Sequence, residues 1–373
     1  MKKVLFITGY PAPYRVRFFD QLGLDTDLTV VFSDRKEDQT HRSQSWFVES
    51  QGHFHAVQLE KGRFRTRGGY LRPDVLPWLK KSWDIIVVCG YASPTIMLAM
   101  AWLRLRGIPF YMEVDGGLIR QDSPLSYRLK RTLVSQAKGW LSTSRATTDY
   151  LVHYGADPGR VWQYPFTTLS ASDIPDRVPT RQEKLALRRE LGLTGENILL
   201  SIGQFIPRKG FDILLKAAAL LDGGTEIYIV GGEPTEEYRT MARQLGLENV
   251  HFVGFLKKEV LTRYYQAADL FVLPTREDIW GLVINEAMAY GLPVVTTDRC
   301  VAGLELVEDG VNGYIVPVED ENALAQRIRL VLEGDRQRMM EASLEKVRPY
   351  TIENMAKAHV EIFTRQTGEC QNG

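Results

Sequence analysis

The chain has 373 residues, 44% of them hydrophobic and 25% charged, and its formal net charge is zero. This length is too great for one ordinary domain and suits two of α/β size, each with its own core. The longest apolar stretch, residues 96–103, is too short to span a bilayer. Three scattered cysteines without metal-type spacing predict a reduced, cytoplasmic setting and no metal site.

The two halves of the chain carry opposite charge. Residues 1–170 contain 23 Lys and Arg against 15 Asp and Glu, whereas residues 171–373 contain 23 against 31. This asymmetry suggests an anionic partner for the first half, although unequal surfaces are also common in unrelated domains.

Short apolar runs alternate with helical patterns through the whole chain. Many of the runs are continuously hydrophobic, as expected for strands buried on both faces of a parallel sheet. Helical patterns at 210–221 and 236–245 lie between them and complete strand–helix–strand units. The predicted strands are residues 4–8, 28–32, 55–59, 85–89, 110–114, 140–143, 198–202, 227–230, 250–253, 270–273, 294–296 and 314–316.

The pattern occurs twice, so we predict two doubly wound, Rossmann-like domains. The first covers residues 1–170 and the second covers 190–348, with the boundary in the polar, aperiodic stretch 166–193. A last helix within 349–366 either caps the second domain or crosses back to the first. Open parallel sheets bind ligands at the carboxyl ends of their strands, so we expect substrates in a central cleft that both domains face.

The most informative run is residues 274–293, which reads as strand end, loop, helix and a glycine stop. Glu277 and Asp278 lie in the loop, and Gly281 lets the backbone approach a ligand closely. The first amides of the following helix suit a diphosphate. Glu286, one turn on, can accept two hydrogen bonds from a vicinal diol such as a ribose. An exposed loop with an ordinary amphipathic helix does not explain a carboxylate between apolar neighbours.

A second run, residues 201–212, follows a strand and opens a helix. It contains Gly203 and two adjacent cations, Arg208 and Lys209, which can bind phosphate oxygens. Its spacing fits neither a Walker loop nor a dinucleotide-binding turn, so ATP hydrolysis and NAD binding lose support. Gly231 ends another strand and either lets a nucleotide lie against the backbone or simply forms a turn.

These runs resemble the C-terminal domain of family 4 retaining glycosyltransferases of the GT-B fold (the glycosyltransferase group 1 type). The resemblance is strong over residues 198–318 and extends to the whole chain by architecture. It implies that Glu286 holds the donor ribose and that Asp278, where the family has glutamate, contacts the transferred sugar. It also implies a phosphate-binding role for Lys209 and backbone donors at Leu282 and Val283.

The chain differs from the family pattern at two positions. Asp278 is shorter than the family's glutamate, and Gln204 stands where the family often has arginine, so Arg208 is expected to supply the second cation. The donor is expected to be a UDP- or GDP-linked sugar, with no cofactor and no metal. Cations and amide dipoles stabilise the leaving diphosphate in such a reaction.

The first domain is expected to bind the acceptor and to supply one polar group near the reacting carbon. Asp115, at the end of a predicted strand, is the first candidate and Glu113 the second; a turn-forming role of Asp115 is the alternative. Gly9 and Arg15 follow the first strand, where Arg15 either meets phosphate or caps the next helix on its outer side.

Basic residues in the first half predict contact with an anionic membrane or a lipid-linked acceptor, or a solvated loop. They are Arg63, Arg65, Arg67, Arg72, Arg104, Arg106, Arg128, Lys130 and Arg131. The protein is therefore predicted to be cytoplasmic or peripheral on the inner face of the cytoplasmic membrane. No recognised nucleic-acid module supports RNA as the partner.

The leading interpretation is a retaining glycosyltransferase of bacterial surface polysaccharide biosynthesis, with a glycan or lipid-linked acceptor. A nucleotide-sugar epimerase or hydrolase of the same fold is one alternative. A non-catalytic nucleotide-sugar-binding protein is the other, suggested by Asp278 and Gln204.

Overall fold

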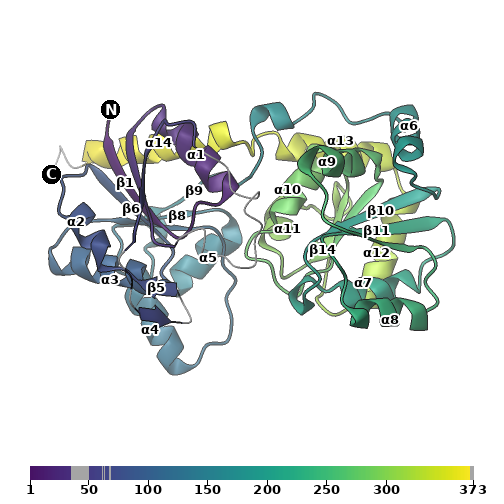
Figure 1. The fold of residues 1–373 in the computed structure, drawn as a ribbon, viewed down its shortest axis with the longest axis horizontal. Coiled ribbons are helices and arrows are strands. Elements are labelled where there is room, and N and C mark those ends of the chain that lie inside the picture. Colours follow the sequence, from purple (N-terminus) through teal and green to yellow (C-terminus); the bar gives the residue numbers. More distant parts are fainter. Residues whose placement is uncertain (35–49, 61, 63, 67–68, 370–373) are drawn as a thin grey trace. The chain divides into compact units, whose positions relative to one another are not determined.

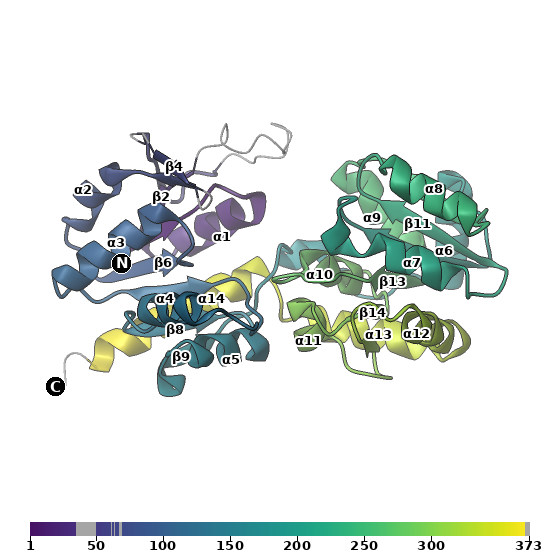
Figure 2. The ribbon, with the colours of Figure 1, turned by 90° about the horizontal axis from the view of Figure 1, so that it is seen from below.

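The computed structural model describes residues 1–34, 50–60, 62, 64–66 and 69–369 of the chain (Figure 1). The chain forms two compact units. Unit 1 contains Met1–Thr167 and the segment from Tyr350 onward, and unit 2 contains Thr168–Pro349. Helices lie on both faces of each unit's sheet (Figures 1 and 2).

Unit 1 is built on a seven-stranded sheet in the order β3-β2-β1-β6-β7-β8-β9, with parallel pairing throughout. Its strands are β1 (Lys3–Thr8), β2 (Asp27–Phe32), β3 (His55–Gln58), β6 (Ile85–Cys89), β7 (Tyr111–Val114), β8 (Gly139–Ser142) and β9 (Val161–Gln163). A separate antiparallel pair joins β4 (Phe64–Thr66) to β5 (Gly69–Leu71).

The helices of unit 1 cover both faces of this sheet because successive side chains of β1 are buried on opposite sides. Leu5 and Ile7 pack in a core that includes residues of α3, whereas the Phe6 ring contacts Phe18 of α1 and Phe363 of α14. The helices are α1 (Pro13–Gly23), α2 (Leu76–Leu79), α3 (Pro94–Leu105), α4 (Pro124–Val134), α5 (Arg145–His153) and α14 (Ile352–Glu369).

Unit 2 has a six-stranded parallel sheet in the order β12-β11-β10-β13-β14-β15. Its strands are β10 (Asn197–Ile202), β11 (Thr225–Val230), β12 (Val250–Val253), β13 (Leu270–Leu273), β14 (Val294–Thr297) and β15 (Gly313–Val316). In chain order within the unit this is 3-2-1-4-5-6, the doubly wound arrangement whose order reverses between β10 and β13.

Helices α7, α8 and α12 pack on one face of the unit 2 sheet around a shared core. Phe211 and Leu214 of α7 and Ile328 of α12 are fully buried there. The helices of this unit are α6 (Arg181–Leu191), α7 (Phe211–Ala218), α8 (Glu236–Gln244), α9 (Lys258–Ala267), α10 (Leu282–Ala289), α11 (Val301–Leu306), α12 (Glu321–Glu333) and α13 (Arg336–Val347).

The predicted fold class, two Rossmann-like parallel-sheet domains, is confirmed. All twelve predicted strands are present, with ends that differ by no more than two residues. Strands β4, β5 and β9 were not predicted; each has only three residues, too few for a periodic pattern to emerge. No helix among the described residues is long and apolar enough to cross a membrane.

Unit 2 begins at Thr168, within the stretch 166–193 where the boundary was expected, and it includes α6, which is anchored to it by two buried cations. Lys184 Nζ donates to the Ala268 carbonyl at 2.6 Å, and Arg188 Nη2 binds Asp269 Oδ2 at 2.5 Å. Burial lowers the pKa of Lys184 to about 8, although Asp269 acts in the opposite direction.

This buried lysine predicts a pH dependence of stability. The pKa of Lys184 is lower in the folded chain than in the unfolded chain, so between pH 8 and 10.5 the unfolded state binds more protons. The free energy of unfolding should therefore rise with pH across this window, by about 2 to 3 kcal/mol from this group. Urea unfolding at pH 8 and pH 10 measures the change. Lys184→Met should lose the rise and the exposed-site variant Lys346→Met should keep it; a rise of equal size in Lys184→Met would contradict the assignment.

Candidate functional site

The candidate site of unit 2 lies where the loops after β10 and β13 meet. These are the two strands at which the sheet order reverses, the place where open parallel sheets bind ligands. The β13 loop is tied to the β10 loop by two hydrogen bonds, since Arg276 N and Thr275 Oγ1 both donate to the Arg208 carbonyl at 2.8 and 2.9 Å. The two predicted runs, 201–212 and 274–293, thus form one site.

Lys209 and Asp278 face one another in this site. Lys209 Nζ donates to Asp278 Oδ2 at 2.6 Å, and Arg208 Nη1 lies 3.5 Å from Asp278 Oδ1. Arg208 also donates to the Glu277 carbonyl at 2.7 Å. Both cations are therefore held beside a single carboxylate, and an anion that replaces that carboxylate finds two preset donors.

Glu277 and its neighbour Arg276 have structural contacts. The Glu277 carboxylate lies 3.9 Å from Arg299 Nη2. Arg276 binds both oxygens of Asp212 at 2.8 and 2.7 Å and also pairs with Glu319. Asp212 lies in the first turn of α7, so Arg276 fixes the β10 loop. This pairing was not predicted, because its three members are far apart along the chain.

Gly231 lies directly against Gly203 at the ends of β11 and β10. A Cβ built at Gly231 would overlap the Gly203 carbonyl oxygen, a backbone atom that cannot turn aside. Gly203 N in turn donates to the Val230 carbonyl at 2.9 Å. Glycine at position 231 is thus required by close backbone approach, and not only by turn formation.

Helix α10 begins directly after the β13 loop that carries Asp278. Gly281, the residue before the helix, has φ of +103°, in the left-handed region that other residues rarely adopt. Leu282 and Val283 occupy the first turn, where amide groups have no carbonyl partner within the helix. Behind Gly281 lies the buried Cys300 thiol, whose pKa burial raises to about 12, so this cysteine packs as a neutral group.

Glu286 lies one turn further along α10 and is partly exposed. Its Oε2 accepts a hydrogen bond from the Tyr265 hydroxyl at 2.9 Å. Burial raises the pKa of Glu286 above its ordinary value, more than the Tyr265 hydrogen bond and Lys258 lower it. Tyr265, on α9, was not identified from the sequence, because an aromatic residue in an amphipathic helix is normally interpreted as part of the hydrophobic core.

Glu113 and Arg15 of unit 1 form a buried ion pair. Arg15 Nη1 donates to both Glu113 oxygens at 2.9 Å, and the two residues are 3% and 1% exposed. Burial acts to raise the pKa of Glu113, but Arg15 and His359 outweigh it and hold the pKa well below its usual range. The outer-side position considered for Arg15 is corrected, since Arg15 is buried, and Glu113 is likewise enclosed.

Asp115 lies two residues beyond Glu113, at the carboxyl end of the sheet, and its side chain is 33% exposed. It accepts hydrogen bonds from Arg15 Nη2 and from the Tyr14 hydroxyl. Burial raises the pKa of Asp115 above its ordinary value, and Glu113 adds to the rise against the effect of Arg15. Of the two predicted acids in unit 1, only Asp115 keeps a surface open to a substrate.

The other predicted residues of unit 1 are placed as follows. Gly9 follows β1, and its carbonyl accepts from Asp34 N at 3.1 Å. Arg63 and Arg67 lie outside the described residues, and Arg65 lies in strand β4. Arg72 is buried, with its Nη1 donating to the Glu60 carbonyl at 3.3 Å, so it does not belong to a basic surface.

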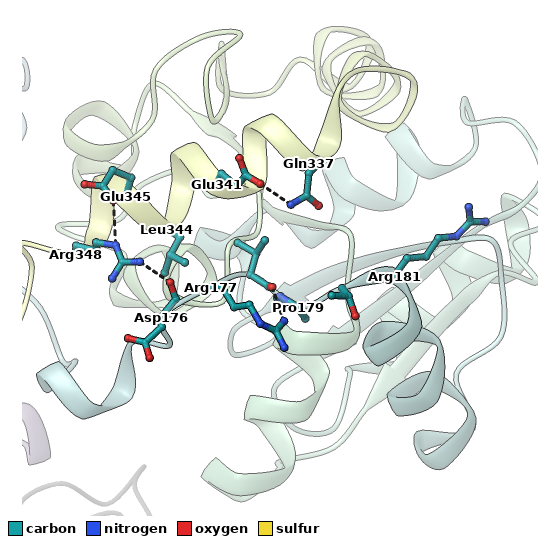
Figure 3. Close-up of a pocket in the computed structure, with 11 residues that line it drawn as sticks. Asp176, Arg177, Pro179, Arg181, Gln337, Glu341, Leu344, Glu345 and Arg348 are labelled. Carbon is teal, nitrogen blue, oxygen red and sulfur yellow. Dashed lines mark hydrogen bonds and ion pairs between the residues drawn. The ribbon is translucent and has the colours of Figure 1, made fainter.

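A cavity of about 530 Å³ lies elsewhere in unit 2, between residues 176–181 and helix α13 (Figure 3). Arg348 at its edge donates to the Asp176 carbonyl at 2.7 Å and binds Glu345. No predicted site residue in the described part of the chain lines this cavity. The candidate site is therefore assigned from the position of the strand ends, and not from this cavity.

Comparisons with known proteins cover the segment that contains this candidate site. Residues 183–346 match the family model described as Glycosyl transferases group 1. A D-inositol 3-phosphate glycosyltransferase of Nocardioides sp. is 33% identical over 240 residues, which are 58% of this chain and 51% of that protein. Another, from Geodermatophilus obscurus, is 35% identical over 196 residues, 48% of this chain and 42% of that protein. The chain thus spans about half the length of the curated relatives it matches.

Solved structures share the whole architecture. Anabaena Alr3699/HepE in complex with UDP has a TM-score of 0.76 at 19% identity, covering 97% of this chain and 100% of that one. Sucrose-phosphate synthase from Thermosynechococcus elongatus has a TM-score of 0.74 at 20% identity, covering 99% and 100%. The chain has the GT-B fold of these structures, and its residues 183–346 match the glycosyl transferases group 1 model.

Proposed function

We propose that the chain is a retaining glycosyltransferase that transfers a sugar from a nucleotide diphosphate to an acceptor without the aid of a metal ion. The observation that carries the proposal is the arrangement of Arg208, Lys209 and the α10 N-terminus around the ends of β10 and β13. This arrangement lies within the segment that matches the glycosyltransferase family model.

The chemistry follows from the charge that develops on the leaving group. As the bond to the sugar breaks, negative charge grows on the diphosphate, and fixed cations and amide dipoles stabilise it without having to reorganise. A bound diphosphate would take the place of Asp278 as the partner of Lys209. Asp278 is then released to accept hydrogen bonds from hydroxyls of the transferred sugar.

Glu286 is assigned to the donor ribose. Its carboxylate is held by Tyr265 at 2.9 Å, which leaves further acceptor positions on its oxygens for the two ribose hydroxyls. The donor base is proposed to be uracil or guanine; structures of the same fold with bound UDP and UDP-glucose support the first of these.

The test is a thermal-shift screen of the purified chain with UDP, GDP, ADP, TDP, CMP and UDP-glucose, without added metal. A ligand of the native state raises the unfolding midpoint by mass action. With the diphosphate that gives a shift, Lys209→Ala and Glu286→Gln should each weaken binding by about 1–3 kcal/mol, the contribution of a hydrogen bond to a charged group. Lys216→Ala, exposed on α7, is the matched control. Unchanged affinity in both site variants would refute the assignment.

The acceptor is proposed to bind unit 1, with Asp115 beside the reacting hydroxyl. The partly exposed carboxylate at the end of β7 supports this, because acceptor deprotonation needs a polar group of raised basicity. A glycan or lipid-linked acceptor of bacterial surface polysaccharide is the proposed substrate class. Release of the nucleotide diphosphate only when an acceptor is present would exclude an epimerase, a hydrolase and a non-catalytic protein.

Peripheral contact with an anionic membrane is proposed through helix α4. Leu125 and Leu129 lie one turn apart on it and are 79% and 54% exposed, and Arg128 and Arg131 are exposed beside them. Two leucines flanked by cations suit the boundary of an anionic bilayer, where each Lys or Arg contributes about 1 kcal/mol.

The membrane proposal is tested by sedimentation with vesicles of phosphatidylserine and phosphatidylcholine. Binding should weaken about tenfold or more in the Leu125→Ser/Leu129→Ser variant, since about 0.8 kcal/mol is lost for each CH₂ no longer buried. Leu330→Ser, at an exposed leucine of unit 2, should bind like the unaltered chain. Equal binding by all three chains would remove α4 from the interface.

A further inference from the structure

A chain of charged groups links the C-terminal helix α14 to Asp115. His359 of α14 is fully buried, and its Nε2 lies 3.4 Å from Glu113 Oε1. Glu113 is bound by Arg15 through Nη1, and Arg15 binds Asp115 through its other terminal nitrogen. All four residues belong to unit 1.

The geometry of His359 defines its contribution. Its Nδ1 lies 2.8 Å from the Met355 carbonyl, so both ring nitrogens face oxygen acceptors. The ring is held in place by aromatic neighbours, with centroids 4.7 Å from Phe18 and 4.5 Å from Tyr164.

Charge is shared unequally in this cluster. One guanidinium, that of Arg15, serves two carboxylates, Glu113 and Asp115. Glu113 receives additional support from His359 and from the Cys89 thiol, which donates to its Oε2 at 3.0 Å. Without that support, Glu113 would interact more strongly with Arg15, because an uncompensated buried carboxylate is costly. The interaction of Arg15 with Asp115 would then weaken.

We propose that His359 and Glu113 are positioning residues for Asp115. His359 of α14 holds Glu113 in place, and Glu113 binds Nη1 of Arg15. The second terminal nitrogen of Arg15, Nη2, is then free to orient Asp115 and to offset its charge. The inference rests on the proposed function only where it calls Asp115 an acceptor-side group. The arrangement of the four residues is independent of it.

Several groups from different elements act on the Asp115 carboxylate. Arg15 and Tyr14 face it from α1, Glu113 from β7, Cys89 from the end of β6, Tyr164 from the segment after β9 and His359 from α14. Glu113 raises the pKa of Asp115, whereas His359 and the Tyr14 hydrogen bond lower it. Removing Glu113 and removing His359 should therefore act in opposite directions.

The experiment is a carbon-13 NMR titration of the full chain labelled at the aspartate carboxyl carbon. The resonance missing from Asp115→Asn identifies Asp115. Relative to the unaltered chain, the titration midpoint should rise by about 0.5 to 1 pH unit in His359→Gln and fall by a similar amount in Glu113→Gln. In the double variant the effect of His359→Gln should shrink, because it acts through Glu113 and Arg15.

The outcomes decide between positioning and packing. A role in packing alone would lower the unfolding temperature of the variants but leave the Asp115 midpoint in place, and this would overturn the inference. If His359→Gln does not fold, the Glu113→Gln variant alone tests the inference. An unchanged titration midpoint of Asp115 in that variant would overturn it. Unimpaired acceptor-dependent release of the nucleotide diphosphate by Asp115→Asn would instead remove Asp115 from the proposed function, with the titration result standing.

Discussion

Replacing Arg15 by methionine is expected to lower the free energy of unfolding of unit 1 by about 3–5 kcal/mol, the usual loss when one partner of a buried ion pair is removed. The reason is geometric. Arg15 is 3% exposed and binds two carboxylates, so its loss leaves the buried Glu113 and the partly exposed Asp115 close together without the guanidinium that both contact. Urea unfolding at pH 7, followed by tryptophan fluorescence, measures the change.

Two further variants check the cause of this loss. Arg15→Met combined with Glu113→Leu should recover a large part of the stability, because an apolar pair of similar volume replaces a buried ion pair at little cost. Arg17→Met, on the same helix and partly exposed, should change the stability by less than about 0.5 kcal/mol. If Arg15→Met behaves like Arg17→Met, the ion pair does not stabilise unit 1.

Gly231→Ala is expected to have the second large effect, with a loss of about 3 kcal/mol or more in the stability of unit 2 and loss of donor binding. The added methyl group would overlap the Gly203 carbonyl oxygen, so the ends of β10 and β11 must move apart. The end of β10 leads into the loop that carries Arg208 and Lys209. Urea unfolding gives the stability, and the thermal shift with the selected diphosphate gives the binding.

The control is Gly254→Ala, just beyond the neighbouring strand β12. A Cβ at Gly254 meets no atom within 4 Å, so the change should cost less than about 0.5 kcal/mol and leave donor binding intact. Native stability together with native donor binding in Gly231→Ala would show that the close approach of the two strand ends is not required.

Local patterns in the sequence determined most of the fold. All twelve predicted strands lie in the two sheets, because a strand buried on both faces is a continuous apolar run that can be read without knowing its partners. The same holds for the loops of unit 2. Lys209 and Asp278 lie in loops that follow strands, and Glu286 lies one turn into the helix after the second loop. The ends of parallel strands must meet at one edge of the sheet. Their roles in catalysis and binding stay predictions.

Only the tertiary structure decided which charged groups pair. Arg15 follows β1 like a residue of an open loop, and its burial depends on Glu113, 98 residues away. In the sequence, His359 and Tyr265 have the pattern of ordinary helix residues. In the fold, His359 lies beside Glu113, and Tyr265 donates a hydrogen bond to Glu286. Apolar burial is non-directional and leaves a periodic trace in the sequence. The partner of a buried charge is fixed by distances of about 3 Å between segments far apart in the chain, and no local pattern records them.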